Sequence, residues 1–309
     1  MPDITLRQLR YFSTLSGVLQ YREAARQLGI SQPSLSQQIA LLEEAVGARL
    51  VERRRSGLIL TPAGRDVTQR AERILGEVHA LKEAARPAGD TLTGTLRLGA
   101  SPTVGPYLLP RVLRHLHQEH PDLRLVIRDG TPRALLEDLL AGRHDLILAQ
   151  LPLPEDEVRV RPLFREDLRL AVARDHPIAR AERVTASDLV GEDMLALSAS
   201  YGLHRQMMSL AAEAGAVLRA DFEGTSLDAV RQMVALGMGV SILPALYVWS
   251  EVARRDADVV CVPLRPAATR EVGLAWRIGS GTPPAYRRLA DVIRARIDAD
   301  FSDLVTVLG

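Results

Sequence analysis

The sequence contains a single cysteine, Cys261, among 309 residues. One thiol excludes an intrachain disulfide and any metal site built from several cysteines. Cys261 stands between Val260 and Val262, and this apolar setting favours a buried, unreactive thiol over a redox sensor. A switch that responds to oxidants through Cys261 stays open as an alternative function.

Long apolar runs are also missing from the chain. No run approaches the roughly 20 residues that a membrane helix needs, and the N-terminus, Met1-Pro2-Asp3-Ile4, lacks the basic-then-apolar layout of a signal peptide. With 47% hydrophobic and 25% charged residues, the composition is that of an ordinary globular protein. We therefore expect a cytoplasmic protein of two or three domains that has no membrane partner.

The patterns typical of catalytic and metal sites are absent as well. No Gly-x-Ser-x-Gly nucleophile turn occurs, and the stretch 237–242, GMGVSI, lacks the third glycine of a dinucleotide-binding loop. His115, His117 and His120 resemble a metal cluster in sequence, but the first two diverge by about 200° around a helix. We expect these histidines on a solvated helix face, and we expect no metal, no cofactor and no enzymatic activity.

Charge is unevenly distributed along the chain. Residues 1–86 carry 13 basic and 9 acidic residues, whereas the remainder carries 26 basic and 29 acidic residues, and the whole chain has a net charge of +1. A basic N-terminal segment followed by a slightly acidic remainder suggests a domain that binds a polyanion, joined to a second part with a different function.

Two short helices joined by a glycine are predicted in the basic part. Residues 21–28 form a short amphipathic segment, and Gly29 follows where a helix must stop. Ser31 is a suitable N-cap for a second helix, and Pro33 is tolerated in its first turn. The apolar positions that recur at helical spacing in this second helix are Leu35, Ile39 and Leu42. This spacing is typical of a helix-turn-helix.

The second helix and the segment after it supply candidates for DNA contact. A basic segment, Arg53-Arg54-Arg55, precedes a Ser56-Gly57 turn and predicts a winged hairpin whose tip contacts phosphates or a minor groove. The second helix offers short polar side chains suited to base edges in a major groove. With the residues at its start, this candidate face comprises Ser31, Gln32, Pro33, Ser34, Ser36, Gln37 and Gln38. The alternative is a helical packing domain whose arginines are merely solvated.

A long helix is predicted to follow the hairpin, from Thr61-Pro62 to about Arg86. Its apolar positions step by four and three residues, at Val67, Ala71, Ile74, Val78 and Leu81. Such a narrow stripe needs a partner and predicts a homodimer. The alternative is that the stripe packs on its own body. The expected domain limits here are 1–61 for the DNA-binding domain and 62–88 for the linker helix.

The body of the chain alternates strand-like runs with helical spacing, which predicts an α/β fold. The strand-like runs are 95–99, 123–127, 145–149, 168–172, 239–243, 259–262 and 271–276, and helical spacing covers 105–119, 131–142, 226–237 and 284–298. Hydroxyl-rich residues follow several runs, at 101–103, 198–201, 224–226 and Thr131. These junctions form a polar cleft for an anion or another acceptor-rich ligand if they converge, and each hydroxyl is simply an N-cap if they do not.

The whole chain resembles the LysR-type transcriptional regulators. The stretch REAARQLGISQPSLSQQIALLEEAVGARLVERRR (22–55) and the following LTPAGR (60–65) are similar to their winged helix-turn-helix and the start of their linker helix. The resemblance implies an all-α N-terminal winged helix-turn-helix and a C-terminal α/β effector domain of two subdomains like those of periplasmic binding proteins. It places subdomain I at 92–165 and 267–301, and subdomain II at 166–266. It also implies a homotetramer on double-stranded promoter DNA and a small-molecule effector.

Within that family the body is most similar to the peroxide-sensing OxyR group. PTVGPYLLP (102–110), TSL (225–227) and LPA (243–245) match in order and spacing. In this register the reactive cysteine of the group falls on Gly202 and its resolving cysteine on Ala211, so both thiols are absent. The resemblance therefore implies an OxyR-like scaffold that does not sense peroxide by disulfide formation. The candidate effector-binding residues are Ser101, Thr103, Thr131, Ser200, Tyr201, Gly202, Thr225 and Arg277.

Overall fold

A computed structural model describes residues 3–54, 57–84, 92–154, 156–224, 226–253, 258–278 and 284–309. The chain forms two compact units, the first comprising Met1–Ala88 with Leu140–Arg143 and the second comprising Gly89–Leu139 and His144–Gly309. Within the described parts, no helix is both long and apolar enough to cross a membrane.

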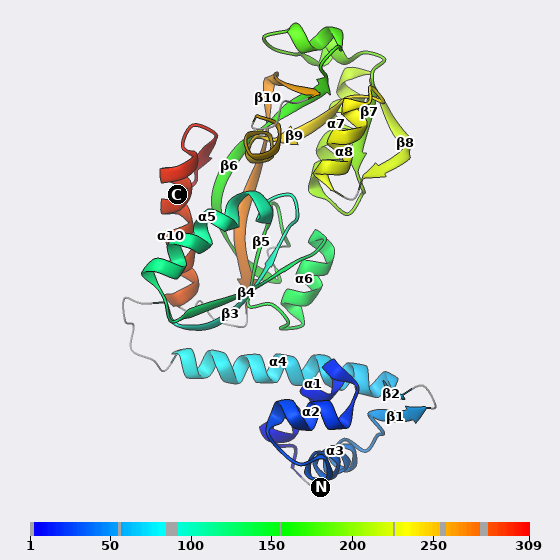
Figure 1. Cartoon of the computed structure of the whole chain (residues 1–309), viewed down its shortest axis with the longest axis vertical. Coiled ribbons are helices and arrows are strands. Elements are labelled where there is room, and N and C mark those ends of the chain that lie inside the picture. The colour runs from blue at the N-terminus through cyan, green and yellow to red at the C-terminus, as the bar shows by residue number, and fades with distance from the viewer. Residues whose placement is uncertain are drawn as a thin grey trace. The chain divides into compact units, whose positions relative to one another are not determined.

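The first unit contains the predicted pair of helices, a hairpin and a long helix (Figure 1). Its elements are α1 (Leu6–Val18), α2 (Tyr21–Leu28), α3 (Gln32–Val46), β1 (Val51–Arg54), β2 (Gly57–Leu60) and α4 (Pro62–Ala84). Gly29 ends α2 in the left-handed conformation, with φ of 66°, which a glycine adopts without steric cost. Ser31 then caps α3, because its hydroxyl accepts a hydrogen bond from the Ser34 N–H.

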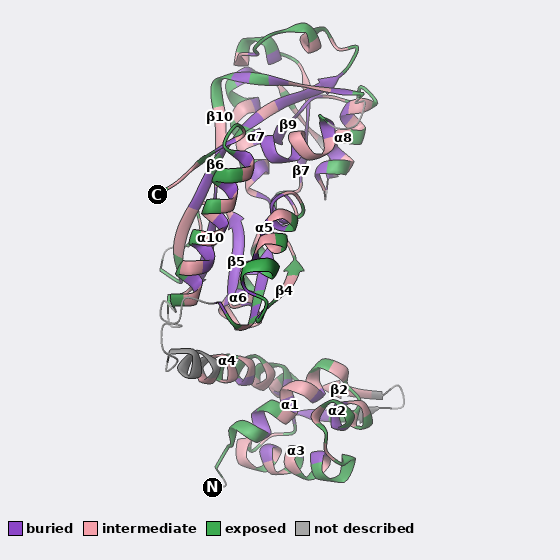
Figure 2. Cartoon of the chain, turned by 60° about the vertical axis from the view of Figure 1, so that its left-hand side comes forward, coloured by how far each residue is buried: buried purple, intermediate pink, exposed green. Residues whose placement is uncertain are grey.

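The core of the first unit is formed by the apolar faces of its helices. Phe12 and Leu15 from α1 are fully buried against Leu35, Ile39 and Leu42 from α3. Figure 2 shows buried, half-buried and exposed positions alternating along these helices. The helical spacing in the sequence therefore predicted the inward face of α3 correctly.

The start of α4 is joined to the preceding loop by a close backbone contact. The Thr61 hydroxyl donates to the carbonyl of Arg49 at 2.7 Å and accepts from the Gly64 N–H at 2.9 Å. A β-carbon built on Gly64 would fall onto the carbonyl oxygen of Leu50, which is fully buried. The turn thus requires glycine at position 64 for space rather than for backbone conformation.

The second unit is built on a mixed seven-stranded sheet, in the order β11-β6-β10-β5-β3-β4, with β9 also paired to β6. Three strands, β3 (Gly94–Ala100), β4 (Leu123–Asp129) and β5 (Leu146–Gln150), are parallel, as an α/β fold requires. The helices beside them and the last strand are α5 (Gly105–Glu119), α6 (Pro132–Leu140), α10 (Pro284–Phe301) and β11 (Val305–Val307).

Two long antiparallel strands, β6 (Val158–Ala173) and β10 (Val259–Arg277), run between the two ends of this unit (Figure 1). The sequence predicted 259–262 and 271–276 as separate strands, and this was wrong, because β10 is continuous through both. The ladder is irregular between Pro263 and Ala268, and prolines in that stretch interrupt the alternation that identifies a strand.

The far end of the second unit has its own core. Its elements are η1 (Pro177–Arg180), η2 (Ala186–Leu189), β7 (Asp193–Leu197), α7 (Gly202–Ala214), β8 (Val217–Gly224), α8 (Leu227–Ala235), β9 (Ser241–Pro244), α9 (Ala245–Tyr247) and η3 (Val248–Val252). One buried apolar cluster includes Leu195, Met207 and Val230, and a separate one around β3 to β5 includes Leu98, Leu148 and Ile293. The observed fold class is therefore the predicted one, and the exact subdomain limits stay predictions.

Candidate functional site

The exposed face of α3 carries the predicted polar side chains. Gln32, Pro33, Ser34 and Gln37 are exposed, and Ser36 and Gln38 are half-buried. The Ser31 hydroxyl is engaged as the N-cap. Because the opposite face of α3 is fixed in the core, this polar face can present amide and hydroxyl groups to the edges of bases.

A partly buried carboxylate contact joins the end of α3 to the hairpin. Glu43 Oε1 accepts hydrogen bonds from the N–H groups of Leu50 and Val51, at 2.7 and 3.2 Å. This contact fixes where β1 begins relative to α3. In the hairpin, Arg54 pairs with Gly57 across the two strands. The side chains of the three predicted wing arginines, Arg53, Arg54 and Arg55, lie outside the described residues.

The apolar stripe of α4 is divided between two environments. Ala71 is only 1% exposed and, with Val67, packs against the core of the first unit itself. Ile74 is 42% exposed and Val78 is half-buried, while the Leu81 side chain lies outside the described residues. The dimer seam stays a prediction, and within it only Ile74 and Val78 are described positions that remain accessible to a partner.

In the second unit, the carboxyl ends of the parallel strands meet a fully buried ion pair. Arg270 and Glu166 have completely buried side chains, and Arg270 Nε donates to Glu166 Oε1 at 2.8 Å. The other guanidinium nitrogens of Arg270 donate to the hydroxyl and the carbonyl oxygen of Thr103, at 2.9 and 2.8 Å. Glu166 Oε2 accepts from the Leu246 N–H at 3.0 Å. Each guanidinium nitrogen of Arg270 and each carboxylate oxygen of Glu166 therefore has a partner within the protein.

This network changes the role expected for Ser101 and Thr103. Both are buried, and their hydroxyls lie 3.1 Å apart. Since Thr103 also accepts from Arg270, its polar atoms hold the buried guanidinium rather than facing an open cleft. The expected participant Arg277 lies elsewhere: it pairs with Val158 at the far end of β10. Arg270, seven residues earlier on the same strand, is the arginine that reaches this edge of the sheet.

A second link joins β5 to α7. Gln150 Nε2 donates to Gln206 Oε1 at 3.0 Å, and Gln206 Nε2 donates to the carbonyl oxygen of Thr269 at 2.7 Å. The end of Gln150 lies directly against Gly202, the first residue of α7. Neither glutamine was predicted as a site residue, because their contact depends on how β5 and α7 pack.

The other predicted hydroxyl-bearing residues do not all gather around the link between Gln150 and Gln206. Tyr201 is 7% exposed, and burial raises the pKa of its hydroxyl, with a smaller contribution from the carboxylate of Asp129. The Thr131 hydroxyl accepts from the Ala134 N–H at 3.3 Å and so caps the start of α6. Ser200 is exposed. Thr225 lies outside the described residues. Thus Tyr201 and Gly202 are brought to the carboxyl edge of the sheet, whereas Thr131 acts as an N-cap.

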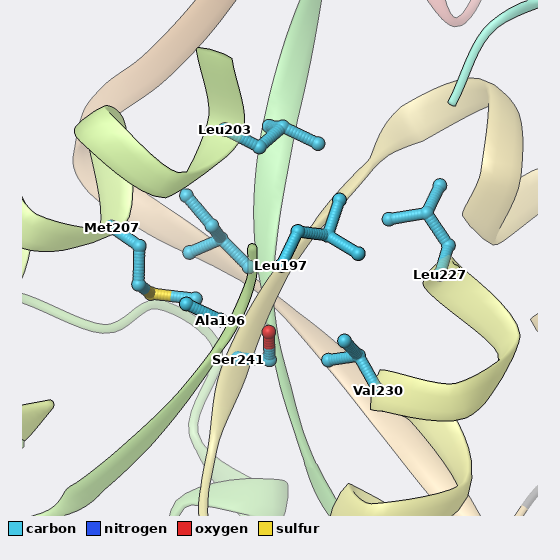
Figure 3. Close-up of a pocket in the computed structure, with 8 residues that line it drawn as sticks. Ala196, Leu197, Leu203, Met207, Leu227, Val230 and Ser241 are labelled. Atoms are coloured by element: carbon cyan, nitrogen blue, oxygen red, sulfur yellow. The ribbon is translucent and has the colours of Figure 1, made fainter. Parts of the chain in front are cut away.

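A small cavity lies between α7, β7 and α8 (Figure 3). Its volume is about 10 Å³, and its lining is mostly apolar side chains from β7, α7 and α8: Ala196, Leu197, Leu203, Met207, Leu227 and Val230. Ser241, which also lines it, donates to the carbonyl of Leu195. A space of this size holds at most one water molecule, so this cavity is no effector site in the described conformation.

Cys261 and His120 occupy structural positions, whereas His117 is exposed as predicted and His115 is half-buried. Burial raises the pKa of the Cys261 thiol to about 12, which leaves it protonated at neutral pH and slow to react. His120 corrects the sequence-based prediction of a solvated face: it is 7% exposed, and its Nδ1 accepts from the Leu92 N–H at 3.2 Å. Burial accordingly lowers the pKa of His120. Among the described residues, no group of three potential ligands could hold a metal ion.

Comparison with known proteins gives two family matches and several relatives. A bacterial regulatory helix-turn-helix protein of the lysR family matches residues 6–65, and a LysR substrate binding domain matches residues 89–298. The DNA-binding transcriptional dual regulator OxyR of Escherichia coli (strain K12) is 38% identical over 302 residues, which cover 98% of this chain and 99% of that protein. A hydrogen peroxide-inducible genes activator of Pectobacterium carotovorum subsp. carotovorum is 40% identical over 294 residues, covering 94% and 96%.

Solved structures show the same similarity over the whole chain. A full-length OxyR from Pseudomonas aeruginosa with a cysteine replaced by aspartate has a TM-score of 0.77 at 31% identity, covering 94% of this chain and 95% of that chain. A cysteine variant of Corynebacterium glutamicum OxyR with bound H2O2 has a TM-score of 0.66 at 31% identity, covering 97% and 94%.

Proposed function

We propose that this chain, which belongs to the LysR family of transcriptional regulators and is related to OxyR, binds double-stranded promoter DNA as a homodimer or homotetramer in the cytoplasm. It is a regulator rather than an enzyme. The observation that carries the DNA proposal is α3, whose apolar face is buried while Gln32, Ser34 and Gln37 are exposed. The effector half is proposed to respond to a small molecule or an anion rather than to form a disulfide.

Replacing Gln32 by alanine is expected to weaken binding to the chain's own promoter region by about tenfold, because one base contact contributes roughly 1–3 kcal/mol. Replacing Arg53 is expected to weaken binding to all DNA and to reduce the salt slope by about one. Titrations of promoter and unrelated duplexes at several salt concentrations separate the two effects. Gln69→Ala, at an exposed position of α4, is the matched control, and a wild-type protein without sequence preference at moderate salt would overturn the proposal.

A second candidate function is an oxidant response through Cys261, and the names of the relatives as peroxide-inducible activators motivate it. Burial opposes it, because it raises the pKa of the Cys261 thiol to about 12 and so lowers the fraction of reactive thiolate at neutral pH. Peroxide is therefore expected to leave promoter binding unchanged in both the wild type and Cys261→Ser. A peroxide response that disappears in Cys261→Ser would instead establish the second candidate.

A further inference from the structure

We propose that Gln150 determines what the effector half can accept at the start of α7, because its carboxamide occupies the space that faces Gly202 and ties α7 to β5 and β10. The end of the Gln150 side chain thus fills the space beside position 202, where the reactive cysteine of the OxyR group is expected. This proposal concerns only the second unit and does not depend on DNA binding.

The first step of the argument is steric. A β-carbon built on Gly202 would lie 2.9 Å from both Cδ and Nε2 of Gln150, and 3.1 Å from Oε1. Side chains do not tolerate carbon contacts of 2.9 Å, so either Gln150 moves or position 202 stays without a β-carbon. The backbone conformation does not require a glycine at position 202, because the φ angle of Gly202 is not positive.

The second step is the hydrogen bond that holds Gln150 in place. Its Nε2 donates to Gln206 Oε1 on the same helix, and Gln206 Nε2 donates onward to the Thr269 carbonyl on β10. Moving the carboxamide away from Gly202 would break the first of these bonds in a partly buried setting, where unpaired polar groups are costly. A β-carbon at position 202 therefore displaces the carboxamide of Gln150 and strains its link to Gln206.

The third step concerns the location of the link. Gln150 ends β5, and Val272, its partner across the ladder, lies on β10. Two positions earlier on β10, Arg270 makes the buried contacts with Glu166 and Thr103. The link therefore lies beside the place where the long strands pass from one core to the other, and it holds α7 there without a ligand or a disulfide. A ligand atom that enters at Gly202 must take over the hydrogen bond to Gln206.

The test is a double-mutant cycle between positions 150 and 202 in the full-length chain. At an unstrained helix start, Gly→Ala normally stabilises a protein by restricting the unfolded chain. We expect the opposite for Gly202→Ala in the wild type, a fall in Tm of about 2 °C or more. In the Gln150→Ala background the same substitution is expected to leave Tm unchanged or to raise it. Both tryptophans, Trp249 and Trp276, lie in the second unit, so their fluorescence reports its unfolding.

Two further variants separate space from hydrogen bonding. Gln150→Met keeps a side chain of similar length without the amide, and its end can move aside without breaking a hydrogen bond, so Gly202→Ala should destabilise that background less than the wild type. Gln118→Ala, at an exposed position of α5, should leave the effect of Gly202→Ala at its wild-type size. Equal effects of Gly202→Ala with and without Gln150 would overturn the proposal.

Thiol chemistry gives a second readout that does not depend on stability. In a Cys261→Ser background, the cysteine of Gly202→Cys is expected to react with a maleimide at least about tenfold more slowly when Gln150 is present than when it is alanine, because the carboxamide covers it. Equal labelling rates in the two backgrounds would contradict the proposal even if both proteins were fully folded.

Discussion

Replacing Arg270 by methionine is expected to lower the free energy of unfolding of the second unit by about 3–5 kcal/mol, the usual cost of breaking a buried ion pair from one side. Glu166 would keep its place with no exposure of its side chain, so its charge would lose the guanidinium without gaining water. Thr103 would lose both hydrogen bonds from Arg270. Urea denaturation followed by tryptophan fluorescence measures the change, because both tryptophans belong to this unit.

The neighbouring pair on the same two strands provides a matched control. Arg165 donates to Glu271 at 2.6 Å, but the two side chains are 48% and 37% exposed. Water screens such a pair, so Arg165→Met is expected to cost less than about 1 kcal/mol. The double variant Glu166→Leu with Arg270→Met should recover part of the lost stability, since no buried charge remains. Equal losses for Arg165→Met and Arg270→Met would refute the role assigned to burial.

Gly64→Ala is expected to destabilise the first unit by about 3 kcal/mol and to abolish promoter binding at physiological temperature. The added β-carbon would fall onto the carbonyl oxygen of Leu50, and both groups belong to backbone that cannot rotate away. Overpacking of this kind typically costs 1–3 kcal/mol when side chains can adjust, and more when they cannot. The Thr61 contacts beside it, to Arg49 and Gly64, would be strained as well.

Gly17→Ala is the corresponding control in α1. A β-carbon at Gly17 meets nothing within 4 Å, so alanine should stabilise this helix by about 0.5–1 kcal/mol. Circular dichroism at 222 nm during thermal unfolding, together with promoter titration, distinguishes the two variants. A Gly64→Ala protein that melts and binds DNA like the wild type would show that the backbone separates at little cost.

The first unit could be predicted from the sequence because its signals are local. Gly29 ends one helix and Ser31 begins the next, and the spacing of Leu35, Ile39 and Leu42 defines a single buried face. Each of these features depends on residues within a few positions of one another. The structure therefore confirms them residue by residue.

The candidate site in the second unit could be predicted only in part, because its contacts join distant segments. Tyr201 and Gly202 were identified through a family resemblance, and both lie at the carboxyl edge of the sheet. Arg270 was missed, and Arg277 was predicted as a site residue in its place. Glu166 and Arg270 are 104 residues apart, and they meet only when β6 and β10 are set in antiparallel register. Gln150 offered no signal of its own, since a glutamine after an apolar strand has no distinctive chemistry.

The two adjacent ion pairs also constrain how the long strands can align during folding. In the native ladder Arg165 faces Glu271 and Glu166 faces Arg270. A slip of one residue in one direction would set Arg165 opposite Arg270, and a slip in the other would set Glu166 opposite Glu271. Like charges opposite one another are destabilising in a ladder, and a one-residue slip also turns every side chain to the wrong face. The dipeptides Arg165-Glu166 and Arg270-Glu271 thus disfavour a one-residue slip of the two strands in either direction.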